Sequence, residues 1–563
     1  MNDQPAGGAN FPWLKNYPPG VNWAASLPVA PLTKLVDDVT AKYPDSIATI
    51  FFDKQHTYRE IGDMIDRAAK GFQALGVKKG TKVGICLPNC TYYVILYFGV
   101  LRAGGTVVNF NPLYVEHELK FQIEDSETEI MCTLDLKALY DKLERVMKQT
   151  RLKKILVCRF ADQLPGLKKL LFPLARRKDI AKVKYDDRNM RYAELVANDG
   201  KYTPVAIDPK EDVAILQYTG GTTGVPKGAM LTHANLYINC MQVNEWFAYR
   251  PPGGERALAI LPFFHVYGMT AILNYSLCRG TTMILVPRFE VENVVKVIDK
   301  HKPTIFAGVP TMYNAILNFK DIKQYDLSSL EFCSAGGAAL PVETMRSWKT
   351  LTGIRICEGY GLTESSPVAV AIPEHGMQKE ASIGVPYPNT IIEIVDLQDP
   401  HKKMPAGERG ELTIRGPQVM KGYWKKPQAT AEVIVDGKLL TGDIAYMDED
   451  GYVFIVDRKK EMIIASGYKV YPRQVEEAIY AHPAVEECAV VGVPDPYRGQ
   501  NVKAYVKLRD GAALTQQELD EFLKDRISPI EMPKFVEFTG PLPKSAIGKI
   551  LKKELIAQDA VKK

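Results

Sequence analysis

The sequence lacks several features that would place it in a narrow class. It has no apolar run of about 18 residues, the length of a membrane-spanning helix. The longest, YYVILYFGVL at 92–101, is followed by Arg102 and predicts a buried helix. Its nine cysteines form no CxxC pair, which favours free thiols in a reducing compartment. Basic residues number 71 and acidic ones 66, so this diffuse excess indicates no nucleic-acid partner.

Targeting signals are also missing from the ends. The opening residues have no charged-then-apolar pattern, and the final DAVKK matches no retention or peroxisomal signal. We therefore expect a cytoplasmic protein.

One segment qualifies that expectation. Residues 164–185, LPGLKKLLFPLARRKDIAKVKY, combine leucines at helical spacing with seven Lys or Arg. Such a segment suits peripheral contact with the inner face of an anionic membrane. In the alternative interpretation the segment is a connector whose leucines pack on the protein, and Pro173 favours that alternative because it interrupts a long helix.

The chain is too long for one hydrophobic core. β-Branched runs alternate with helical patterns over most of its length, which predicts an α/β fold with largely parallel sheets. From Asn389 onward, strands joined by turn-rich loops predict a smaller β-rich subdomain. A small α+β domain is expected to follow, with its boundary at Asp457–Arg458. The expected domains are therefore 1–457 and 458–563.

A dense cluster of glycine and threonine marks a phosphate site. YTGGTTGVPKGAM, at 218–230, follows an apolar strand pattern and precedes a helical one. Glycines let consecutive backbone N–H groups approach one anion, while threonine hydroxyls and Lys227 add donors and charge. Because Gly228 follows Lys227, the GxxxxGK[ST] pattern of the P-loop nucleotide hydrolases is not met. The stretch predicts a phosphate loop of another kind.

This loop resembles that of the superfamily of acyl- and aryl-CoA synthetases, luciferases and peptide-synthetase adenylation domains. Three further stretches resemble that superfamily's motifs in the same order: EGYGLTES at 358–365, LTGDIAYMDEDGYVFIVDRKKEMIIASGYKVYP at 440–472 and LPKSAIGKI at 542–550. The resemblance spans essentially the whole chain. It is strongest to bacterial long-chain fatty-acid–CoA ligases, which share a WLKNYP-like opening, LQYTGGTTG, EGYGLTE and KGYW.

The resemblance implies ATP-dependent activation of a long-chain fatty acid, with Mg²⁺, ATP and coenzyme A. The carboxylate attacks the α-phosphorus of ATP and expels pyrophosphate, and the thiol of coenzyme A then displaces AMP from the acyl-AMP. Two negatively charged reactants must meet in the first step. Positive charge and oriented dipoles should therefore dominate catalysis.

The resemblance also implies roles at the nucleotide. Glu364 would bind Mg²⁺, Thr363 would contact the α-phosphate, and Tyr360 would cover the adenine. Asp443 and Arg458 would hold the ribose, although Asp443 alone also fits a turn aspartate. The full set of expected ATP-binding residues is Thr219, Gly220, Gly221, Thr222, Thr223, Gly224, Lys227, Gly337, Ala338, Glu358, Gly359, Tyr360, Gly361, Asp443 and Arg458.

Lys549 is the expected catalytic residue, together with Thr363 and His265. Its ammonium would bridge the attacking carboxylate and the α-phosphate. Because Lys549 belongs to the small domain, rotation at the hinge would remove it after the first step. The same rotation would present a surface that binds coenzyme A, for which the candidates are Lys459, Gly467, Tyr468 and Lys469. In the alternative interpretation, Lys459 and Lys469 belong only to a solvated face.

The acyl group has three candidate contacts. His265, in LPFFHVYGM at 261–269, would orient or shield the acid rather than deprotonate it, because a carboxylic acid is already ionised at pH 7. Gly336 would let the acyl group approach the backbone. Gly308 would widen the wall of an acyl tunnel. The alternatives are a core histidine for His265 and a turn glycine for Gly308.

Several other functions stay open at this point. A medium-chain or aryl (4-coumarate-like) acid is the nearest rival substrate, followed by a peptide-synthetase adenylation domain and a luciferase-type oxygenase. No carrier-type GxDS serine follows Lys549, which disfavours the adenylation domain. A kinase or NTPase would make ADP, and the missing GK[ST] argues against it. A regulator that only binds an acyl-nucleotide would not require Glu364, Asp443, Arg458 and Lys549 together. The sequence leaves a homodimer open.

Overall fold

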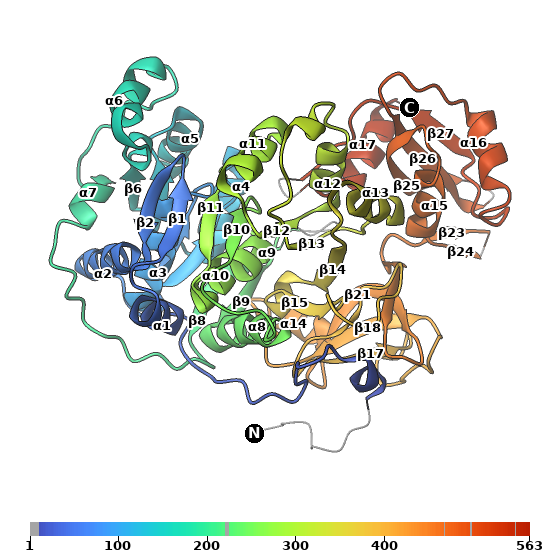
Figure 1. The fold of residues 1–563 in the computed structure, drawn as a ribbon, viewed down its shortest axis with the longest axis horizontal. Coiled ribbons are helices and arrows are strands. Elements are labelled where there is room, and N and C mark those ends of the chain that lie inside the picture. Colours follow the sequence, from blue (N-terminus) through green and yellow to red (C-terminus); the bar gives the residue numbers. More distant parts are fainter. Residues whose placement is uncertain (1–10, 220–224, 467, 496–497, 546–547, 563) are drawn as a thin grey trace.

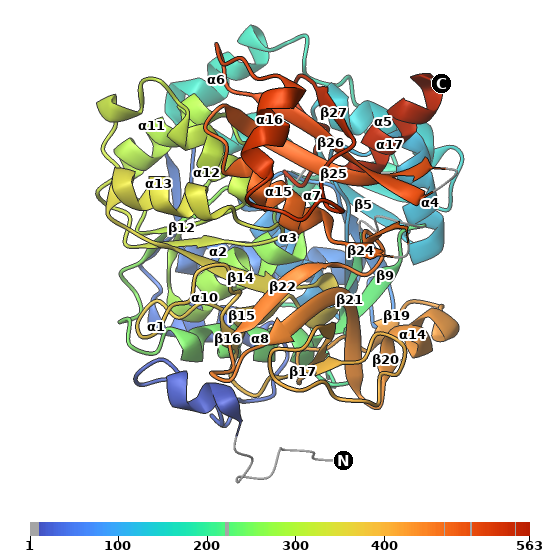
Figure 2. The same cartoon turned by 90° about the vertical axis from the view of Figure 1, so that its right-hand side faces the viewer.

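The computed structural model describes residues 11–219, 225–466, 468–495, 498–545 and 548–562. Two large subdomains with mainly parallel sheets lie side by side at the left and centre of Figure 1. A β-rich subdomain, in orange, lies below a C-terminal unit in red. Figure 2, seen from the side of these two units, shows the red one above the orange one. This arrangement confirms the α/β fold with a β-rich subdomain and a final α+β unit.

The first large sheet carries the strands on both sides of the phosphate loop. Within the described residues its order is β19-β9-β8-β4-β3-β5-β6-β7. The run from β8 to β7 is parallel, while β9 is antiparallel to β8 and β19 to β9. Its strands are β3 (Lys82–Ile85), β4 (Thr106–Asn109), β5 (Ile130–Leu134), β6 (Lys154–Cys158), β7 (Asn189–Arg191), β8 (Val213–Tyr218), β9 (Gly228–Thr232) and β19 (Gly422–Tyr423).

The second large sheet has the order β16-β15-β14-β13-β12-β10-β11-β1-β2. It is parallel from β14 to β1, with antiparallel strands at each edge. Parallel strands bring their carboxyl ends to one edge of a sheet, which is where α/β proteins bind ligands. The strands are β1 (Ile47–Phe51), β2 (Lys54–Thr57), β10 (Arg256–Ala259), β11 (Thr282–Leu285), β12 (Ile305–Gly308), β13 (Phe332–Ala335), β14 (Ile356–Gly361), β15 (Val368–Ala371) and β16 (Val385–Pro386).

Helices cover these two sheets. They are α1 (Lys34–Lys42), α2 (Tyr58–Ala74), α3 (Thr91–Arg102), α4 (Glu116–Ser126), α5 (Lys137–Met147), α6 (Gly166–Ala175), α7 (Tyr192–Leu195), α8 (His233–Trp246), α9 (Val266–Gly268), α10 (Tyr275–Arg279), α11 (Val291–His301), α12 (Pro310–Leu317) and α13 (Val342–Thr352). The apolar run at 92–101 forms most of α3, all twelve residues of which are buried. None of the described helices has the length and apolar content needed to cross a bilayer.

Helices α2 and α3 illustrate how the sequence sets the packing. Thr57 and Glu60 form a capping box that starts α2, satisfying backbone N–H groups at the helix end. A Cβ at Gly99 of α3 would lie 2.8 Å from the Cβ of Ala68 on α2. The missing side chain therefore lets the two helices approach closely.

The two smaller sheets follow. The β-rich sheet has the order β17-β18-β21-β20, with β22 on β21, and its elements are β17 (Ile391–Val395), β18 (Gly410–Arg415), α14 (Pro427–Val433), β20 (Ile434–Val435), β21 (Lys438–Met447) and β22 (Val453–Arg458). The C-terminal sheet has the order β24-β23-β26-β25, with β27 on β26. This unit contains β23 (Ile463–Ala465), β24 (Tyr468–Val470), α15 (Pro472–Tyr480), β25 (Val485–Asp495), β26 (Gly499–Leu508), α16 (Gln516–Leu523), β27 (Phe535–Phe538) and α17 (Lys552–Lys562).

Candidate active site

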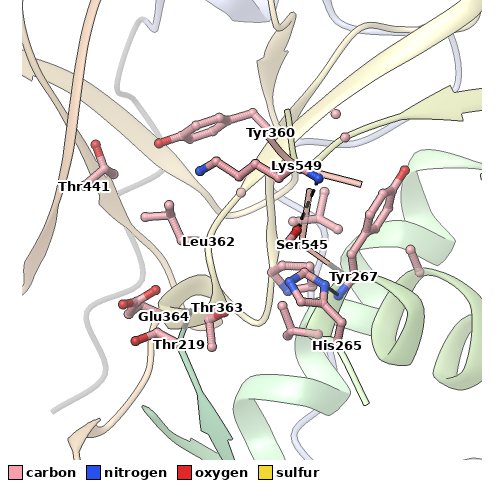
Figure 3. Close-up of a pocket in the computed structure, with 18 of the residues that line it drawn as sticks. Thr219, His265, Tyr267, Tyr360, Leu362, Thr363, Glu364, Thr441, Ser545 and Lys549 are labelled. Atoms are coloured by element: carbon pink, nitrogen blue, oxygen red, sulfur yellow. Dashed lines mark hydrogen bonds between the residues drawn. The ribbon is translucent and has the colours of Figure 1, made fainter. Parts of the chain in front are cut away.

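A pocket of about 890 Å³ lies where the large subdomains meet the C-terminal unit. Thr219 follows β8, Tyr360 is the last residue but one of β14, and Lys549 enters from the C-terminal unit (Figure 3). The carboxyl ends of two parallel sheets thus supply one wall of the pocket, and a segment about 200 residues further along the chain supplies another. The pocket has a polar part around these residues and an apolar branch that extends toward α8.

Three residues at the polar part are joined by an ion pair and a hydrogen bond. Asp443 on β21 pairs in register with Arg458 on β22, and its Oδ1 lies 3.3 Å from Nε of Arg458. The hydroxyl of Tyr360 donates to Oδ2 of Asp443 at 2.5 Å. Burial, followed by the charge of Asp443, raises the pKa of Tyr360 well above its usual value. Tyr360 is therefore a protonated donor, and the buried Asp443 carboxylate is held in one orientation.

Glu364 lies on the 3₁₀ turn η5 (Thr363–Ser365) and lines the pocket. Its Oε1 accepts a hydrogen bond of 2.6 Å from the hydroxyl of Tyr423 on β19. The ring of Tyr423 also receives the ammonium of Lys227, whose Nζ lies 4.9 Å from the ring centroid. Tyr423 therefore links the acidic residue to the lysine of the phosphate loop. A cation over an aromatic face is favourable by about 0.5–2 kcal/mol.

Lys549 is placed by a tight turn of the C-terminal unit. The N–H of Lys549 donates to Oγ of Ser545 at 3.2 Å, and its carbonyl accepts from the N–H of Ser545 at 2.8 Å. Gly548 has a φ of 76°, and an added Cβ would lie 2.4 Å from Oγ1 of Thr311. Only glycine fits this close approach in a left-handed conformation. The turn directs the Lys549 side chain alongside Tyr360 (Figure 3).

The pKa of Lys549 lies close to neutral pH, so its charge responds to its surroundings. Burial lowers its pKa to about 8, and the positive charge of Arg458 adds to this shift. The ammonium form therefore predominates at neutral pH. An anionic ligand in the pocket would favour that form further, because a nearby opposite charge stabilises it.

His265 borders the transition from the polar part to the apolar branch. Burial, followed by the charge of Lys549, lowers its pKa to about 4. The imidazole is consequently neutral at pH 7. Its Nδ1 accepts the N–H of Tyr267 at 3.3 Å, which leaves the other ring nitrogen as the N–H donor. A neutral donor fits orientation of a carboxylate and not proton abstraction.

The apolar branch runs along one face of the second sheet. Side chains at alternate positions of a strand point to the same face of its sheet. Ile305 and Ala307 of β12 pair with Phe332 and Ser334 of β13, so these four side chains share one face. Helix α8 and its C-terminal end close the opposite side. The principal lining side chains of this branch are Val243, Trp246, Phe247, Ala271, Tyr275, Ile305, Ala307, Phe332 and Tyr387.

Most of the predicted site residues that the structure describes meet at this pocket. Those that line it are Thr219, His265, Gly336, Gly337, Gly359, Tyr360, Gly361, Thr363, Glu364, Arg458 and Lys549. Asp443 lies directly behind Arg458, which lines the pocket, and Lys227 contacts Tyr423, the partner of the lining residue Glu364. The residues Gly220, Gly221, Thr222, Thr223, Gly224 and Gly467 lie outside the described part of the chain.

Three predicted residues are placed elsewhere in the large unit. A Cβ at Gly308 would meet the rings of Tyr313 and Phe306 at 3.1–3.2 Å, so this position faces aromatic side chains and not the pocket. Ala338 is half-buried beside Gly337. Oε1 of the buried Glu358 accepts the N–H of Leu340 at 3.4 Å, and burial raises the pKa of its carboxyl to about 7.

Three of the four candidate coenzyme A residues, Lys459, Tyr468 and Lys469, are described by the structure, and none of the three lines the pocket. Nζ of Lys459 pairs with Oε2 of Glu411 at 2.8 Å and donates to the carbonyl of Leu397 at 2.7 Å. Tyr468 and Lys469 are exposed on β24. In this arrangement of the two units they do not face Lys549.

Sequence reasoning missed Tyr423 and the apolar branch. Tyr423 belongs to the KGYW stretch, which was noted only as part of the resemblance. Its role depends on the antiparallel pairing of β19 with β9, a contact between segments about 190 residues apart. The branch is built from alternate residues of strands and one face of a helix, a pattern that any buried sheet also produces.

Comparison with known proteins agrees with this geometry. The model of the AMP-binding enzyme family matches residues 36–424, and that of the AMP-binding enzyme C-terminal domain matches 474–549. A long-chain-fatty-acid–CoA ligase of Bacillus subtilis (strain 168) is 45% identical over 97% of this chain and 98% of its own. A protein of the same name from Escherichia coli O6:H1 is 38% identical over 96% and 97%.

Solved structures resemble the whole arrangement. ATP-bound MatB from Rhodopseudomonas palustris has a TM-score of 0.82 at 27% identity, covering 93% of this chain and 98% of its own. The anthranilate CoA ligase AuaEII with anthranoyl-AMP has a TM-score of 0.80 at 25% identity, covering 94% and 98%. From the family models and the full-length relatives, the chain belongs to the AMP-binding enzyme family.

Proposed function

We propose that this protein is an AMP-forming long-chain fatty-acid–CoA ligase. One observation carries the proposal: Lys549 of the C-terminal unit lies in the same pocket as Tyr360, Arg458 and Glu364. Two cations, a tyrosine hydroxyl and a carboxylate meet there beside an apolar branch. These are the groups needed to hold ATP next to a fatty acid. The medium-chain and aryl acids remain the alternative substrates.

In the first step a carboxylate oxygen attacks the α-phosphorus of ATP. The bond from that phosphorus to the bridging oxygen breaks, and pyrophosphate leaves with the electron pair. We place the ammonium of Lys549 between the attacking carboxylate and the α-phosphate, where its positive charge offsets the repulsion between the two anions. Thr363 would donate to the α-phosphate. His265, neutral at pH 7, would hold the carboxylate in line.

Asp443 and Arg458 would fix the ribose. The Asp443 carboxylate accepts hydrogen bonds only, which suits two sugar hydroxyls. Its present donors, Tyr360 and Arg458, already restrain it. The site is therefore organised before the nucleotide arrives, which reduces the reorganisation needed for catalysis. Thr219 and Lys227, with Gly220–Gly224 between them, would hold the β- and γ-phosphates.

We assign Mg²⁺ to Glu364. The fit rests on the donor set: one oxygen of Glu364 accepts from Tyr423, which leaves the other for a hard cation. No group of three or more His, Cys, Asp or Glu able to hold a metal gathers among the described residues, so phosphate oxygens would complete the coordination. When bound, the ion would neutralise charge on the departing pyrophosphate.

In the second step the thiol of coenzyme A attacks the acyl carbon, AMP leaves, and the thiol proton is released. We propose that the C-terminal domain, 458–563, rotates about Asp457 for this step. Asp457 is buried, and its carboxylate accepts the N–H groups of Arg458 and Arg473 at 2.6 and 2.9 Å. Rotation would bring Lys459, Gly467, Tyr468 and Lys469 toward the pantetheine path.

Two observations support a long-chain acid. The relatives that span the whole chain carry that name, and the apolar branch extends from His265 past Ala307 to Phe332. Apolar lining of this kind favours an alkyl chain because it removes the chain from water. A long-chain acid also partitions into lipid, so we include peripheral membrane contact through residues 164–185. A homodimer stays part of the proposal, and light scattering in solution would test it.

The test is a nucleotide assay. Purified protein is incubated with Mg²⁺-ATP and oleate, with and without coenzyme A, and the nucleotides are separated. We expect AMP to accumulate over many turnovers only when coenzyme A is present. A panel of acids from octanoate to oleate, with 4-coumarate, distinguishes the alternatives. Formation of ADP, or no nucleotide change with any acid, would contradict the proposal.

A further inference from the structure

Helix α6 presents leucines to solvent along one side. The exposed fractions are 67% for Leu167, 67% for Leu170, 50% for Leu171 and 76% for Leu174. Positions i, i+3, i+4 and i+7 share one face of a helix. None of the ten residues of α6 is buried. In Figure 1 the helix lies at the outer edge of the first subdomain, far from the C-terminal unit.

The other side of α6 is fixed to the protein. The ring of Phe172 packs against that of Phe160, with centroids 4.8 Å apart. Nζ of Lys168 lies 3.2 Å from Oδ2 of Asp53, and Nζ of Lys169 lies 2.9 Å from Oδ1 of Asp162. These contacts set the rotation of the helix. The outward direction of the leucines therefore follows from how the helix is attached.

The exposure of these leucines contradicts the alternative in which residues 164–185 are a connector whose leucines pack on the protein. That alternative requires the leucines to pack on the protein, and at half to three-quarters exposure they do not. Pro173 lies inside α6 without ending it, because the helix continues to Ala175. Single exposed leucines are ordinary on protein surfaces, but four on one helical face form a contiguous patch that marks an interaction site.

The charge around this leucine face selects the partner. Residues 164–185 contain seven basic residues and one acidic residue, an excess of six in a chain whose total excess is five. The rest of the chain is thus almost neutral. Arg177, Lys178, Lys182 and Lys184 are exposed in the segment that follows α6. An apolar face beside concentrated positive charge complements a bilayer with anionic headgroups.

We propose that α6 docks on an anionic lipid bilayer. Leu167, Leu170, Leu171 and Leu174 enter the boundary between headgroups and acyl chains, and the basic residues after α6 lie among the phosphates. Burial of the leucines supplies apolar attraction, and the charges supply attraction that salt weakens. The helix lies in the plane of the interface, since ten residues cannot span it. This docking deepens the membrane contact included in the proposed function, but it needs neither ATP nor an acid, so the vesicle experiment and the nucleotide assay can fail separately.

The experiment is vesicle flotation with the full-length protein and no substrate. Vesicles of phosphatidylcholine alone are compared with vesicles containing about a third phosphatidylglycerol. We expect binding to the anionic vesicles at low salt, with a loss of about tenfold in affinity as salt rises to 0.5 M. Binding that is absent from both vesicles, or equal on both and unaffected by salt, would overturn the proposal.

Two variants locate the surface. Changing all four leucines to serine should weaken vesicle binding about a hundredfold, because each loses its apolar contact with lipid. The matched control, Val29→Ser with Leu351→Ser, alters two exposed apolar residues outside α6, at 46% and 36% exposure, and should bind as the wild type. Equal loss in both variants, or no loss in the first, would contradict the assignment to α6.

A second copy of the chain is the competing occupant of this face. If the leucine variant changes the mass measured by light scattering while neither form binds vesicles, the face is a protein interface and the lipid proposal fails. Leu170→Trp gives an independent readout that does not depend on loss of binding. Its fluorescence should be quenched by brominated anionic lipid more than that of the wild type, and equal quenching would contradict insertion. The ligase activity of these variants on octanoate is expected to be unchanged, which separates docking from catalysis.

Discussion

The two walls of the pocket are held in different ways. Tyr360 on β14 and Asp443 on β21 belong to the large unit and are joined by a hydrogen bond, and Asp443 also pairs with Arg458, which ends β22 beside the hinge. Lys549 lies on a turn of the C-terminal unit, where the carbonyl of Gly548 accepts from Oγ1 of Thr311 at 3.4 Å. A long, half-exposed hydrogen bond of this kind is worth about 1 kcal/mol or less. One wall is therefore held together within the large unit, whereas the other depends on contacts between the two units, among them this bond and that of Arg509 to Asn318.

The largest expected effect comes from Lys549, in the wall that the C-terminal unit supplies. Lys549→Ala should slow acyl-AMP formation about a thousandfold, because it removes the charge between two anions. Thioester formation from supplied acyl-AMP should change less than threefold. Measuring the two half-reactions separately provides the check, and equal losses would mean that Lys549 serves both steps and that the comparison fails.

Glu364→Ala should have the second largest effect on acyl-AMP formation. Loss of the carboxylate is expected to lower the rate of acyl-AMP formation about a hundredfold and to raise the Mg²⁺ concentration needed for half-maximal rate. Titration of Mg²⁺ at fixed ATP measures both. Thr219→Ala, in the same wall but without charge, is the control and should leave the Mg²⁺ requirement unchanged. An unaltered metal dependence in Glu364→Ala would remove this residue from the site.

The pH dependence of acyl-AMP formation tests the charge of Lys549. The pKa of Lys549 is about 8, so its charge is present below that pH and lost as pH rises through it. The kcat/KM for ATP in acyl-AMP formation, which reports the free enzyme, should fall about tenfold between pH 7 and pH 9. In Lys549→Arg the fall should disappear, because arginine stays charged. A fall that persists in this variant would have another cause.

Tyr423→Phe should have the smallest effect. It removes one hydrogen bond to Glu364 while keeping the ring under Lys227. We expect about a fivefold loss in acyl-AMP formation, with a weaker Mg²⁺ response and an unchanged melting temperature. Binding of ATP with and without Mg²⁺, measured by calorimetry, separates a positioning role from a structural one. A lower melting temperature with normal Mg²⁺ coupling would indicate packing alone.

The sequence predicted the polar wall better than the apolar one. Tyr360, Glu364 and Lys549 belong to local motifs whose residue types are dictated by phosphate, metal and charge. They meet at the pocket although they lie far apart in the chain. Gly308 was predicted to widen the acyl branch, yet it faces Tyr313 and Phe306. Which way one glycine points depends on side-chain packing between neighbouring strands, and no local pattern encodes that.

Helices α3 and α6 make the same point about apolar runs. Both are rich in hydrophobic residues, but α3 is buried throughout, whereas none of the residues of α6 is buried. The difference visible in the sequence is charge: α3 ends with a single arginine, while lysines and arginines surround the leucines of α6. The α/β fold and the buried helix were predictable from alternation and length. The orientation of α6 was not, because it depends on Asp53 and Asp162, which lie 115 and 7 residues from the lysines they pair with.

The most direct test of the account is exchange of labelled pyrophosphate into ATP without coenzyme A. The first step is reversible, so the wild-type protein should exchange label only when a long-chain acid and Mg²⁺ are present. Lys549→Ala should lose this exchange yet still convert supplied oleoyl-AMP and coenzyme A into the thioester. Exchange that does not require the acid, or that survives in Lys549→Ala, would contradict acyl-AMP formation by this pocket.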